Sequence, residues 1–544
     1  MDSLWTALLG ARRSTVHCWT GHGFAAATWA EVGADARRTA AGLRGLGVRP
    51  GTTVAAIMTN TPAAVRGVLA IWLAGGAVAS LPVPARGMGV DEYLAQIAAI
   101  CRSAGARLLL TDGALLQALP EGALGGIACR EWESIGEGPA IEACPPGEDE
   151  PAFIQYSSGS TGTPKGCVLT PRAIAAQLEL IRDMSDADPA RERVVSWLPL
   201  SHDMGMFGCT LFPWFFDMPL VMSTPERFMF GGRSWFADLA EFGGTMTAGT
   251  NTALFLAARA QHGRPLNHRL EVRTAIIGAE RVERAALLAA SAAFDGLPLE
   301  SFMPAYGMAE ATLAVSASTP RTTPRFTSVD GFELAHGRVS HVSPDAPEAT
   351  WLVGCGPPCK DVGISSTVPS GVGELVVKSP SLALGYQGDP ELTAARFTSA
   401  GFRTGDLGFL HDGEVFPVGR LDEVISFGGR NVSTREAERE IEAMDLVHRG
   451  CAAVLDLGSE GPAGRLVLVA ELSRAGAAPS EVADTAREAA RIASARCGLV
   501  LDACVFLRRG SLPKTPSGKV QRHRARRLLL AEALPAIATV PLAT

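Results

Sequence analysis

The sequence predicts an α/β protein with a large domain, residues 1–420, followed by a smaller α+β domain, residues 421–544. A chain of 544 residues exceeds what one hydrophobic core usually serves, which predicts at least two domains. Short apolar runs alternate with alanine-rich helical segments over the first half, as in a parallel sheet covered on both faces. The sequence pattern then changes at the Pro/Thr-rich stretch 318–328, after which shorter strands and turns are predicted.

The first half contains helices and strands in alternation. Residues 28–48 predict a helix, because Thr28 and Glu31 have the spacing of a capping box and an apolar stripe at helical spacing follows. Predicted strands are 54–58, 77–83, 107–112, 194–200, 218–223, 245–250 and 273–280. The longest apolar stretch, 68–83, is interrupted by glycine and proline, so it predicts a buried helix and strand and no membrane span.

The second half predicts different architecture. Between 373–379 and 413–420 the strands are short and separated by turns, which indicates a small β-barrel. The residues after Arg420 alternate strand and helix and predict a separate C-terminal domain.

Composition excludes several classes of function. The net charge of −7 gives no reason to expect nucleic acid as a partner. The first residues lack a basic segment followed by an apolar one, and eleven cysteines without an export signal indicate reduced thiols in a cytoplasmic protein. Cys355 and Cys359 form a close pair with no second pair at suitable spacing, so we expect no zinc site there.

The stretch 153–170 predicts strand, tight loop, strand, with a loop suited to a polyphosphate. Its glycines let backbone N–H groups approach a ligand, its hydroxyls donate, and its lysine adds charge. The candidate ligands are Ser157, Ser158, Gly159, Ser160, Thr161, Gly162, Thr163 and Lys165. It is not the GxxxxGK[ST] loop, because Pro164 stands where the second glycine should be. The alternative is a flexible linker, but linkers are not usually bracketed by apolar strands.

Four further segments carry candidate chemistry. His202 follows a predicted strand, Tyr306 lies in a loop, and Glu310 begins a predicted helix as a hard oxygen ligand for the Mg²⁺ that accompanies ATP. Asp406 can accept two hydrogen bonds from a ribose diol, and Arg420 supplies a permanent charge. Each has a structural alternative: a satisfied turn histidine, a glutamate at a helix N-terminus, an acidic turn residue. Likewise, Lys514 and Lys519 could belong to a solvated basic tail.

Together these motifs resemble those of the adenylate-forming enzymes, in family order and over nearly the whole chain. The motifs are YSSGSTGTPKG, LPLSHDMG, GAERV, YGMAEATLAVS, TGD with GRLDE, and PKTPSGKVQR, and they look closest to fatty acyl-AMP ligases. The resemblance implies two wound α/β subdomains plus a small barrel, followed by a mobile lid that turns about Asp422.

The resemblance also implies roles for individual residues. Lys519 would swing into the site, where its ammonium stabilises the charge that builds up as carboxylate and α-phosphate approach. His202 would orient the substrate carboxylate, and Glu310 would help to hold Mg²⁺. Beyond the phosphate loop, the nucleotide would be bound by Gly278, Ala279, Glu280, Ala305, Tyr306, Gly307, Met308, Asp406 and Arg420. The acyl pocket would include Met206, Thr250 and Asn251.

The implied reaction is activation of a carboxylic acid with ATP and Mg²⁺, followed by transfer to the phosphopantetheine thiol of an acyl carrier protein. Residues 326–360 look like the extra segment of fatty acyl-AMP ligases, which is thought to restrict the lid and disfavour free coenzyme A; a variable surface loop is the alternative. An acyl-CoA ligase and a nucleotide-binding scaffold without chemistry remain rival functions. The chain departs from the family at AGTNTALF, 248–255, and at Ser201, which leaves the acyl chain open.

Overall fold

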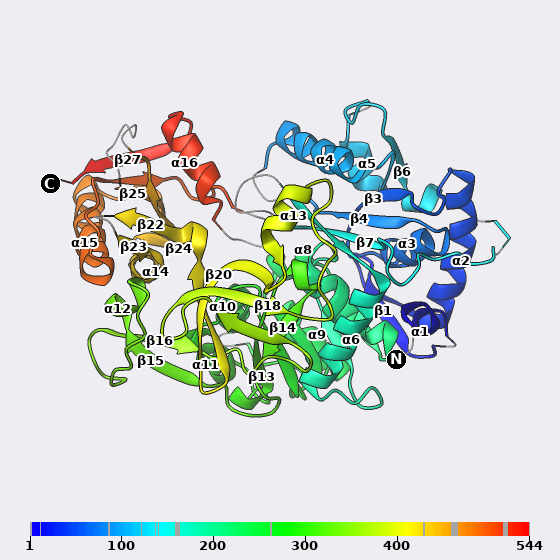
Figure 1. Ribbon diagram of the computed structural model, residues 1–544, viewed down its shortest axis with the longest axis horizontal. Coiled ribbons are helices and arrows are strands. Elements are labelled where there is room, and N and C mark those ends of the chain that lie inside the picture. The colour runs from blue at the N-terminus through cyan, green and yellow to red at the C-terminus, as the bar shows by residue number, and fades with distance from the viewer. Residues whose placement is uncertain are drawn as a thin grey trace.

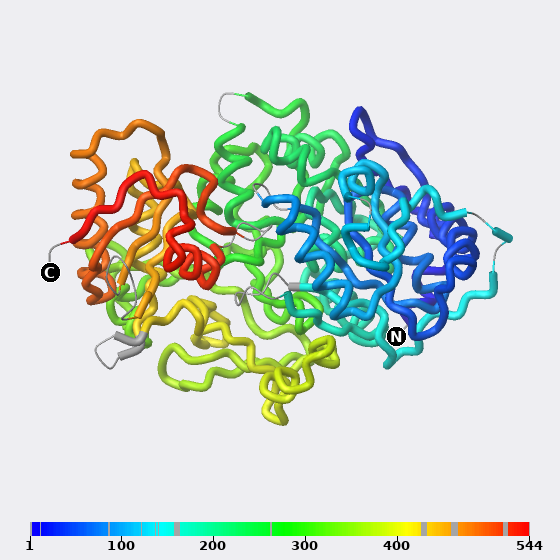
Figure 2. Tube along the Cα trace, turned by 90° about the horizontal axis from the view of Figure 1, so that it is seen from above, coloured from blue at the N-terminus to red at the C-terminus, as the bar shows by residue number. Residues whose placement is uncertain are grey.

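The structure is a computed structural model, and its N-terminal strands and its C-terminal domain lie at opposite ends of the longest axis (Figures 1 and 2). It describes residues 3–10, 12–84, 88–120, 122–136, 138–139, 141–157, 164–261, 264–427, 430–458, 466–514 and 520–542.

The first sheet of the large domain has eight strands in the described residues and is parallel except at its two edges. In order across the sheet these are β14 (Ala314–Ala317), β13 (Phe302–Gly307), β12 (Thr274–Ile277), β11 (Met246–Gly249), β9 (Val194–Ser196), β10 (Leu220–Met222), β1 (Thr15–Trp19) and β2 (Phe24–Thr28). Since β9, β11, β12 and β13 run parallel, their carboxyl ends share one edge of the sheet.

The second sheet has six described strands and is parallel except for its last pair. Its strands are, in order, β6 (Ala128–Glu131), β5 (Leu108–Thr111), β3 (Thr53–Ile57), β4 (Ala77–Leu81), β7 (Phe153–Ser157) and β8 (Lys165–Leu169). Every residue of β4 and β5 is buried, so both faces of this sheet are covered, as continuous apolar runs predict.

Helices of the large domain begin where the sequence supplies caps. In α2, Thr28 and Glu31 form the capping box expected from their spacing, and α3 begins with a Thr61 cap followed by Pro62. The helices are α1 (Leu4–Leu9), α2 (Trp29–Gly45), α3 (Pro62–Leu73), α4 (Val90–Ala104), α5 (Gly113–Ala118), α6 (Pro171–Ser185), α7 (Phe212–Phe215), α8 (Pro225–Phe230), α9 (Ser234–Phe242), α10 (Asn251–Gln261) and α11 (Arg284–Ala293).

One hydrophobic core joins the two sheets. The ring of Phe153 on β7 lies 6.4 Å from that of Trp72 on α3 and 5.2 Å from that of Phe207, which follows β9. The two wound units therefore pack as one body, and the loops at their strand ends are held in fixed relation.

The segment expected to be a small barrel contains a five-stranded antiparallel sheet. Its strands are β17 (Gly363–Ser366), β18 (Gly373–Lys378), β19 (Phe397–Thr398), β20 (Gly401–His411) and β21 (Glu414–Arg420), with α13 (Pro390–Arg396) before β19. Ahead of it, residues 326–353 form the antiparallel pair β15 (Phe326–Asp330) and β16 (Ala349–Val353), joined through α12 (Gly331–Ala335).

The C-terminal residues form an α+β unit with its own buried clusters. Its elements are β22 (Val424–Phe427), β23 (Arg430–Ser433), α14 (Arg435–Glu442), β24 (Val447–Asp456), β25 (Leu466–Leu472), α15 (Pro479–Cys497), β26 (Ala503–Leu507), α16 (Arg522–Leu530) and β27 (Ala536–Pro541). Helix α12 packs on α15, so the segment before the five-stranded sheet lies against this unit (Figure 1).

Most expected elements are present, with one clear error. The expected helix beginning at Glu310 is wrong: Ala309–Ala311 make a single 3₁₀ turn, and the chain returns as strand β14. Thr312 causes the reversal, because its φ of 64° ends the turn and its hydroxyl donates to the carbonyl of Ser381. Residues Ala314–Ala317 then pair with β13 as a fully buried antiparallel strand.

Among the described residues, no helix is long and apolar enough to cross a membrane.

Candidate nucleotide site

The predicted site residues of the large domain gather where parallel strands end. Ligands of wound α/β sheets bind outside the carboxyl ends of the strands. Strand β11 is followed by Thr250 and Asn251, β12 by the Gly278–Glu280 loop, and β13 by Met308 and Glu310. The sequence motifs therefore meet at one edge of the first sheet.

The phosphate loop is described only at its two ends. Ser157 ends β7 and pairs with Lys165, the first residue of β8, so the strand–loop–strand prediction is confirmed at the strands. The predicted ligands Ser158, Gly159, Ser160, Thr161, Gly162 and Thr163 lie outside the described residues.

Glu310 and Lys165 both lie near Tyr386, a residue that no motif singled out. The hydroxyl of Tyr386 donates to Oε1 of Glu310 at 2.8 Å, and Nζ of Lys165 lies 6.0 Å from the centre of the Tyr386 ring. Tyr386 is placed by backbone bonds of its segment to β8, including Leu384 N–H to Val168 O at 2.9 Å. Burial raises the pKa of Glu310, although the Tyr386 hydrogen bond opposes this shift.

Gly307 makes the sharp return after β13 possible. A Cβ at this position would lie 1.9 Å from the carbonyl oxygen of Leu313, which only glycine avoids. Met308 N–H donates to that same oxygen at 2.7 Å and closes the turn that presents Glu310.

Asp406 on β20 joins the same site through two partners. Its Oδ2 accepts from the hydroxyl of Tyr306 at 2.8 Å, and its Oδ1 accepts from Arg420 at 2.7 Å. The predicted ribose reader, Tyr306 and Arg420 are thus brought together from three strands.

The Gly278–Glu280 loop is held against neighbouring strand ends. Gly278 N–H donates to Gly249 O at 3.1 Å, and Oε2 of Glu280 accepts from the Thr252 hydroxyl at 2.9 Å. Ala279 has a φ of 62°, a conformation rare outside glycine that often marks functional loops. Ala305, on β13, has its carbonyl oxygen 3.1 Å from where a Cβ on Gly278 would lie, so the two predicted segments pack closely.

His202 lies between β9 and the π-helix Met204–Leu211, half-buried beside Asp203. Its Nδ1 is 2.5 Å from Oδ1 of Asp203, which orients the ring. The amide nitrogen of the Gln155 side chain donates to Ser201 O at 2.8 Å and ties this segment to the second sheet. The backbone next to His202 is thus held between the two sheets.

The three predicted acyl-pocket residues have structural contacts. Met206 is 1% exposed, within the core that joins the sheets. Thr250 accepts a hydrogen bond from Ala253 N–H at the start of α10, and Oδ1 of Asn251 accepts from Glu283 N–H at 2.9 Å. Their roles in acyl binding remain predictions.

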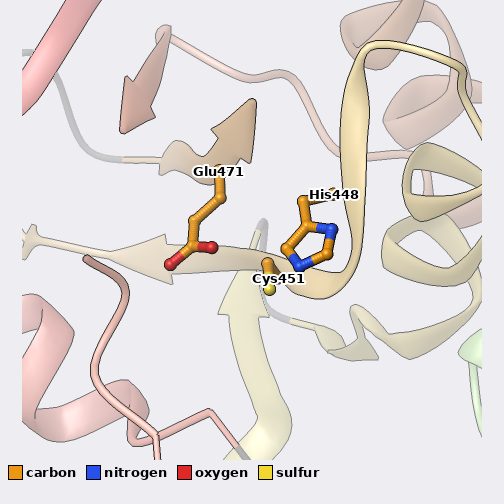
Figure 3. A group of neighbouring side chains, drawn as sticks. All are labelled: His448, Cys451 and Glu471. Atoms are coloured by element: carbon orange, nitrogen blue, oxygen red, sulfur yellow. The ribbon is translucent and has the colours of Figure 1, made fainter. Parts of the chain in front are cut away.

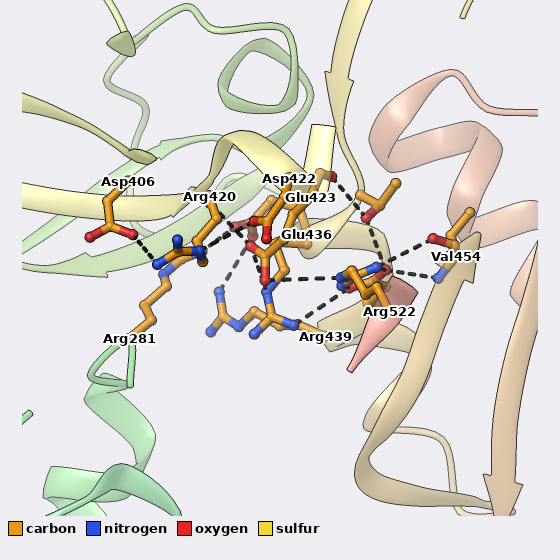
Figure 4. Close-up of polar contacts among 12 residues, drawn as sticks. Arg281, Asp406, Arg420, Asp422, Glu423, Glu436, Arg439, Val454 and Arg522 are labelled. Atoms are coloured by element: carbon orange, nitrogen blue, oxygen red, sulfur yellow. Dashed lines mark hydrogen bonds and ion pairs between the residues drawn. The ribbon is translucent and has the colours of Figure 1, made fainter. Parts of the chain in front are cut away.

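An ion-pair network leads from this site into the C-terminal unit (Figure 4). Arg420 contacts the predicted hinge residue Asp422 at 3.2 Å, and its N–H donates to Glu423 at 3.1 Å. Glu423 lies 4.0 Å from Arg522 of α16, which donates to Glu438 at 2.7 Å. Arg522 comes three positions after Lys519, so the network ends beside the last motif.

A second ionic contact holds the C-terminal unit against the large domain. Arg281, next to the Gly278–Glu280 loop, donates to Glu436 of α14 at 2.5 Å, with both side chains largely buried. Burial opposes the charge of Glu436, but Arg281 and Arg439 outweigh it and lower its pKa to about 2. Arg439 and Arg449 both reach Glu283, at 3.4 Å and 3.2 Å.

Lys519 lies outside the described residues, but the stem of its loop does not. Lys514 and Val520 form a β-bridge, and Gln521 N–H donates to Pro513 O at 2.9 Å. The segment 515–519 is therefore closed at its base.

The donor set at Glu310 fits Mg²⁺ bound mainly through nucleotide phosphates. Mg²⁺ usually keeps several waters and takes one or two protein carboxylates plus phosphate oxygens. In the described part of the chain, three potential ligands cluster at His448, Cys451 and Glu471, away from Glu310. Cys355 and Cys359 are both buried free thiols and join no such cluster in that part of the chain.

Sequence reasoning missed Tyr386, Arg281 and Arg522. Tyr386 follows an unremarkable Leu-Gly pair, and both arginines look like surface charges in a chain with 49 basic residues. Both arginines nevertheless carried a signal, since Arg281 belongs to the GAERV motif and Arg522 ends the PKTPSGKVQR motif.

Comparison with known proteins supports the assignment of a nucleotide-binding site. The model of the AMP-binding enzyme family matches residues 11–387. The chain is 32% identical over 510 residues to a putative ligase of Mycobacterium tuberculosis, covering 91% of this chain and 93% of that protein. It is 30% identical over 404 residues to the medium-chain-fatty-acid–[acyl-carrier-protein] ligase JamA of Moorena producens, covering 70% and 67%.

The same architecture occurs in a solved structure from a study of fatty acyl-adenylate ligases of E. coli and L. pneumophila. The two superpose with a TM-score of 0.87 over 98% of each chain, at 24% identity. This confirms the predicted fold class.

Proposed function

The chain belongs to the AMP-binding enzyme family and is a ligase, and on that premise we propose that it activates a fatty or related carboxylic acid as acyl-AMP and transfers the acyl group to an acyl carrier protein. Attack of the carboxylate on the α-phosphate of ATP forms the acyl–AMP anhydride and releases pyrophosphate. The phosphopantetheine thiol then attacks the acyl carbon and AMP leaves.

The observation that carries the adenylation step is the meeting of Glu310, Asp406 and Arg420 beside the phosphate loop. Asp406 would accept hydrogen bonds from the ribose, Tyr306 would stack on the adenine, and Arg420 would add positive charge. Glu310 would hold Mg²⁺, which when bound neutralises phosphate charge. Lys519 supplies a mobile cation at the reacting centre. Positioning and electrostatics suffice, with no covalent enzyme intermediate.

Support for a carrier protein as acceptor comes from the segment 326–353 and from JamA. Phe332 of α12 packs on Gly498 at the end of α15, and Arg496 of α15 donates to Pro347 O at 3.4 Å. These contacts restrict how the C-terminal unit can turn about Asp422. The relative JamA is named for transfer to an acyl carrier protein.

Pyrophosphate release and hydroxamate trapping over a panel of carboxylic acids test the first step. Adenylation of at least one fatty or related acid is expected, and no substrate-dependent pyrophosphate in the whole panel contradicts it. Holo carrier protein and free coenzyme A are then compared at equal concentration. Acyl transfer to the carrier alone supports the proposal, whereas AMP release driven by micromolar coenzyme A identifies an acyl-CoA ligase.

Lys519→Ala isolates the role of the last motif. We expect adenylation to fall by about 100-fold or more, because a charge at the reacting centre is lost, while ATP binding stays largely intact. Lys378→Ala is the matched control, since Lys378 is an exposed lysine at the end of β18. Full adenylation by Lys519→Ala would contradict the proposed mechanism.

A further inference from the structure

Three different metal-ligand types meet in the C-terminal unit, outside the nucleotide site. His448 and Cys451 come from β24 and Glu471 from β25, and their ligand atoms all lie within 4.8 Å of one another (Figure 3). Val447 pairs with Leu472 and Ala452 with Ala470, so four residues of β24 bulge opposite the single residue 471. Bulges re-aim side chains beside functional sites, and this one turns an imidazole and a thiol toward a carboxylate.

This ligand set matches a thiophilic divalent cation. Zn²⁺ takes thiolate, imidazole and carboxylate ligands at about 2.0–2.3 Å, which places tetrahedral ligand atoms roughly 3.5 Å apart. The three side chains need only a small contraction to reach that geometry. Cys451 and Glu471 are each 2% exposed, and the half-buried His448 gives access from the surface.

An ammonium group lies against the thiol of this ligand set. Nζ of Lys514 lies 2.9 Å from Sγ of Cys451, and the two oxygens of Glu471 accept from Gly510 and Leu512 N–H at 2.9 Å and 2.7 Å. The ammonium of Lys514 therefore contacts the atom that would bind the metal.

We propose that His448, Cys451 and Glu471 form a Zn²⁺ site whose occupation expels the ammonium of Lys514. Binding forms a Zn–S bond and releases the thiol proton to solvent. Zn²⁺, thiolate and carboxylate together carry no net charge, and the bound cation repels the ammonium that lies against the sulfur.

Expulsion of Lys514 has a consequence at the loop that carries Lys519. Lys514 forms the β-bridge with Val520 that closes this loop, and Glu471 holds the preceding turn through Gly510 and Leu512. Moving the Lys514 side chain therefore disturbs the stem of the catalytic loop, so Zn²⁺ inhibits adenylation. This consequence rests on the proposed function, whereas the metal site itself does not.

Titration of the full chain with Co²⁺ tests the site directly. One equivalent is expected to give a near-ultraviolet thiolate-to-cobalt charge-transfer band with intense four-coordinate visible bands. Cys451→Ser should lose the charge-transfer band, and His448→Gln should weaken binding by more than about 10-fold. Cys144→Ser is the matched control, because Cys144 is an exposed cysteine far along the chain, and it should bind as the wild type does.

Circular dichroism on each variant, with Cys451→Ala as a second substitution, separates lost ligands from lost folding. Lys514→Ala should bind Co²⁺ more tightly, because the competing ammonium is gone. No charge-transfer band in the wild type, an equal band in a folded Cys451→Ser, or weaker binding by Lys514→Ala overturns the proposal.

Adenylation in excess Mg²⁺ provides the second readout. Stoichiometric Zn²⁺ should inhibit the wild type at least several-fold, a chelator should reverse this, and Cys451→Ser should resist it. A cobalt band without inhibition refutes the coupling. An inactive wild type that still gives the band refutes the proposed function and leaves the metal site standing.

Discussion

Two carboxylates in this protein, the half-buried Glu310 and the buried Glu436, meet opposite electrostatic surroundings. Glu310, in the nucleotide site, accepts from the neutral hydroxyl of Tyr386, and burial raises its pKa. Glu436, where the C-terminal unit meets the large domain, lies between the guanidinium groups of Arg281 and Arg439, which lower its pKa to about 2 despite burial.

Glu310 is therefore suited to bind a cation, whereas the negative charge of Glu436 is already compensated by two arginines. A neutral partner orients Glu310 without compensating its charge, so an incoming cation gains the full attraction. At Glu436 the compensation is complete, and the pair holds two parts of the molecule together. If Asp422 is the hinge that we propose, rotation about it would first have to separate Arg281 from Glu436, which leaves two charges to be rehydrated.

Removing the charge of Glu310 should have the largest effect. Glu310→Gln is expected to lower the adenylation rate about 100- to 1,000-fold, because the carboxylate that would hold Mg²⁺ is gone, while thermal stability does not fall. Steady-state pyrophosphate release measures this. Tyr386→Phe, which keeps the carboxylate, should cost only about 10-fold. Wild-type activity in Glu310→Gln would show that the site needs no charge there.

The second-largest effect is expected from breaking the ion pair between Arg281 and Glu436. Arg281→Ala leaves Glu436 with less compensation, and removing one partner of a buried ion pair typically costs about 3 kcal/mol. Denaturant unfolding should therefore shift to lower concentration, and limited proteolysis near Asp422 should accelerate. Arg487→Ala, on the exposed face of α15, is the control. Equal unfolding and equal cleavage in Arg281→Ala and the wild type would show that the Arg281–Glu436 pair does not hold the two parts of the molecule together.

The pH dependence of stability tests the same difference between Glu436 and Glu310. The ordinary pKa of a glutamate, 4.5, falls to about 2 in folded Glu436, so its contribution to stability is complete above about pH 4.5 and is lost as pH falls toward 2. The raised pKa of Glu310 acts with opposite sign, since its ionisation costs the folded state free energy as pH rises above 4.5. Glu436→Gln should thus approach wild-type stability in acid, and Glu310→Gln should gain on the wild type with rising pH. Parallel pH profiles for both variants would contradict these assignments.

The smallest effect is expected at Asp406. Asp406→Asn keeps the shape but loses charge-assisted bonds to ribose, so KM for ATP should rise about 10-fold with a smaller change in kcat. Tyr306→Phe, which removes the other Asp406 partner, should change KM less. An unchanged KM in Asp406→Asn would place the ribose elsewhere.

The order of strands and loops was predictable from the sequence because it depends on local patterns. Apolar runs such as 77–83 and 153–156 became buried strands, and Thr28 with Glu31 capped α2. The same local patterns placed Lys165 at the end of a loop, but they assigned Asp406 to a turn, whereas it lies within strand β20. They also failed at Glu310, where Thr312 and its bond to Ser381 replaced the expected helix with a turn and a strand.

Local patterns thus determined the elements, the motif residues and the class of chemistry, because turns, caps and apolar periodicity act over a few positions. The tertiary structure alone decided which charges compensate one another. Tyr386 meets Glu310 across 76 positions, Arg281 meets Glu436 across 155, and Lys514 meets Cys451 across 63. Such pairs follow from how sheets pack and how a bulge turns a strand, and nothing in the residues flanking either partner specifies them.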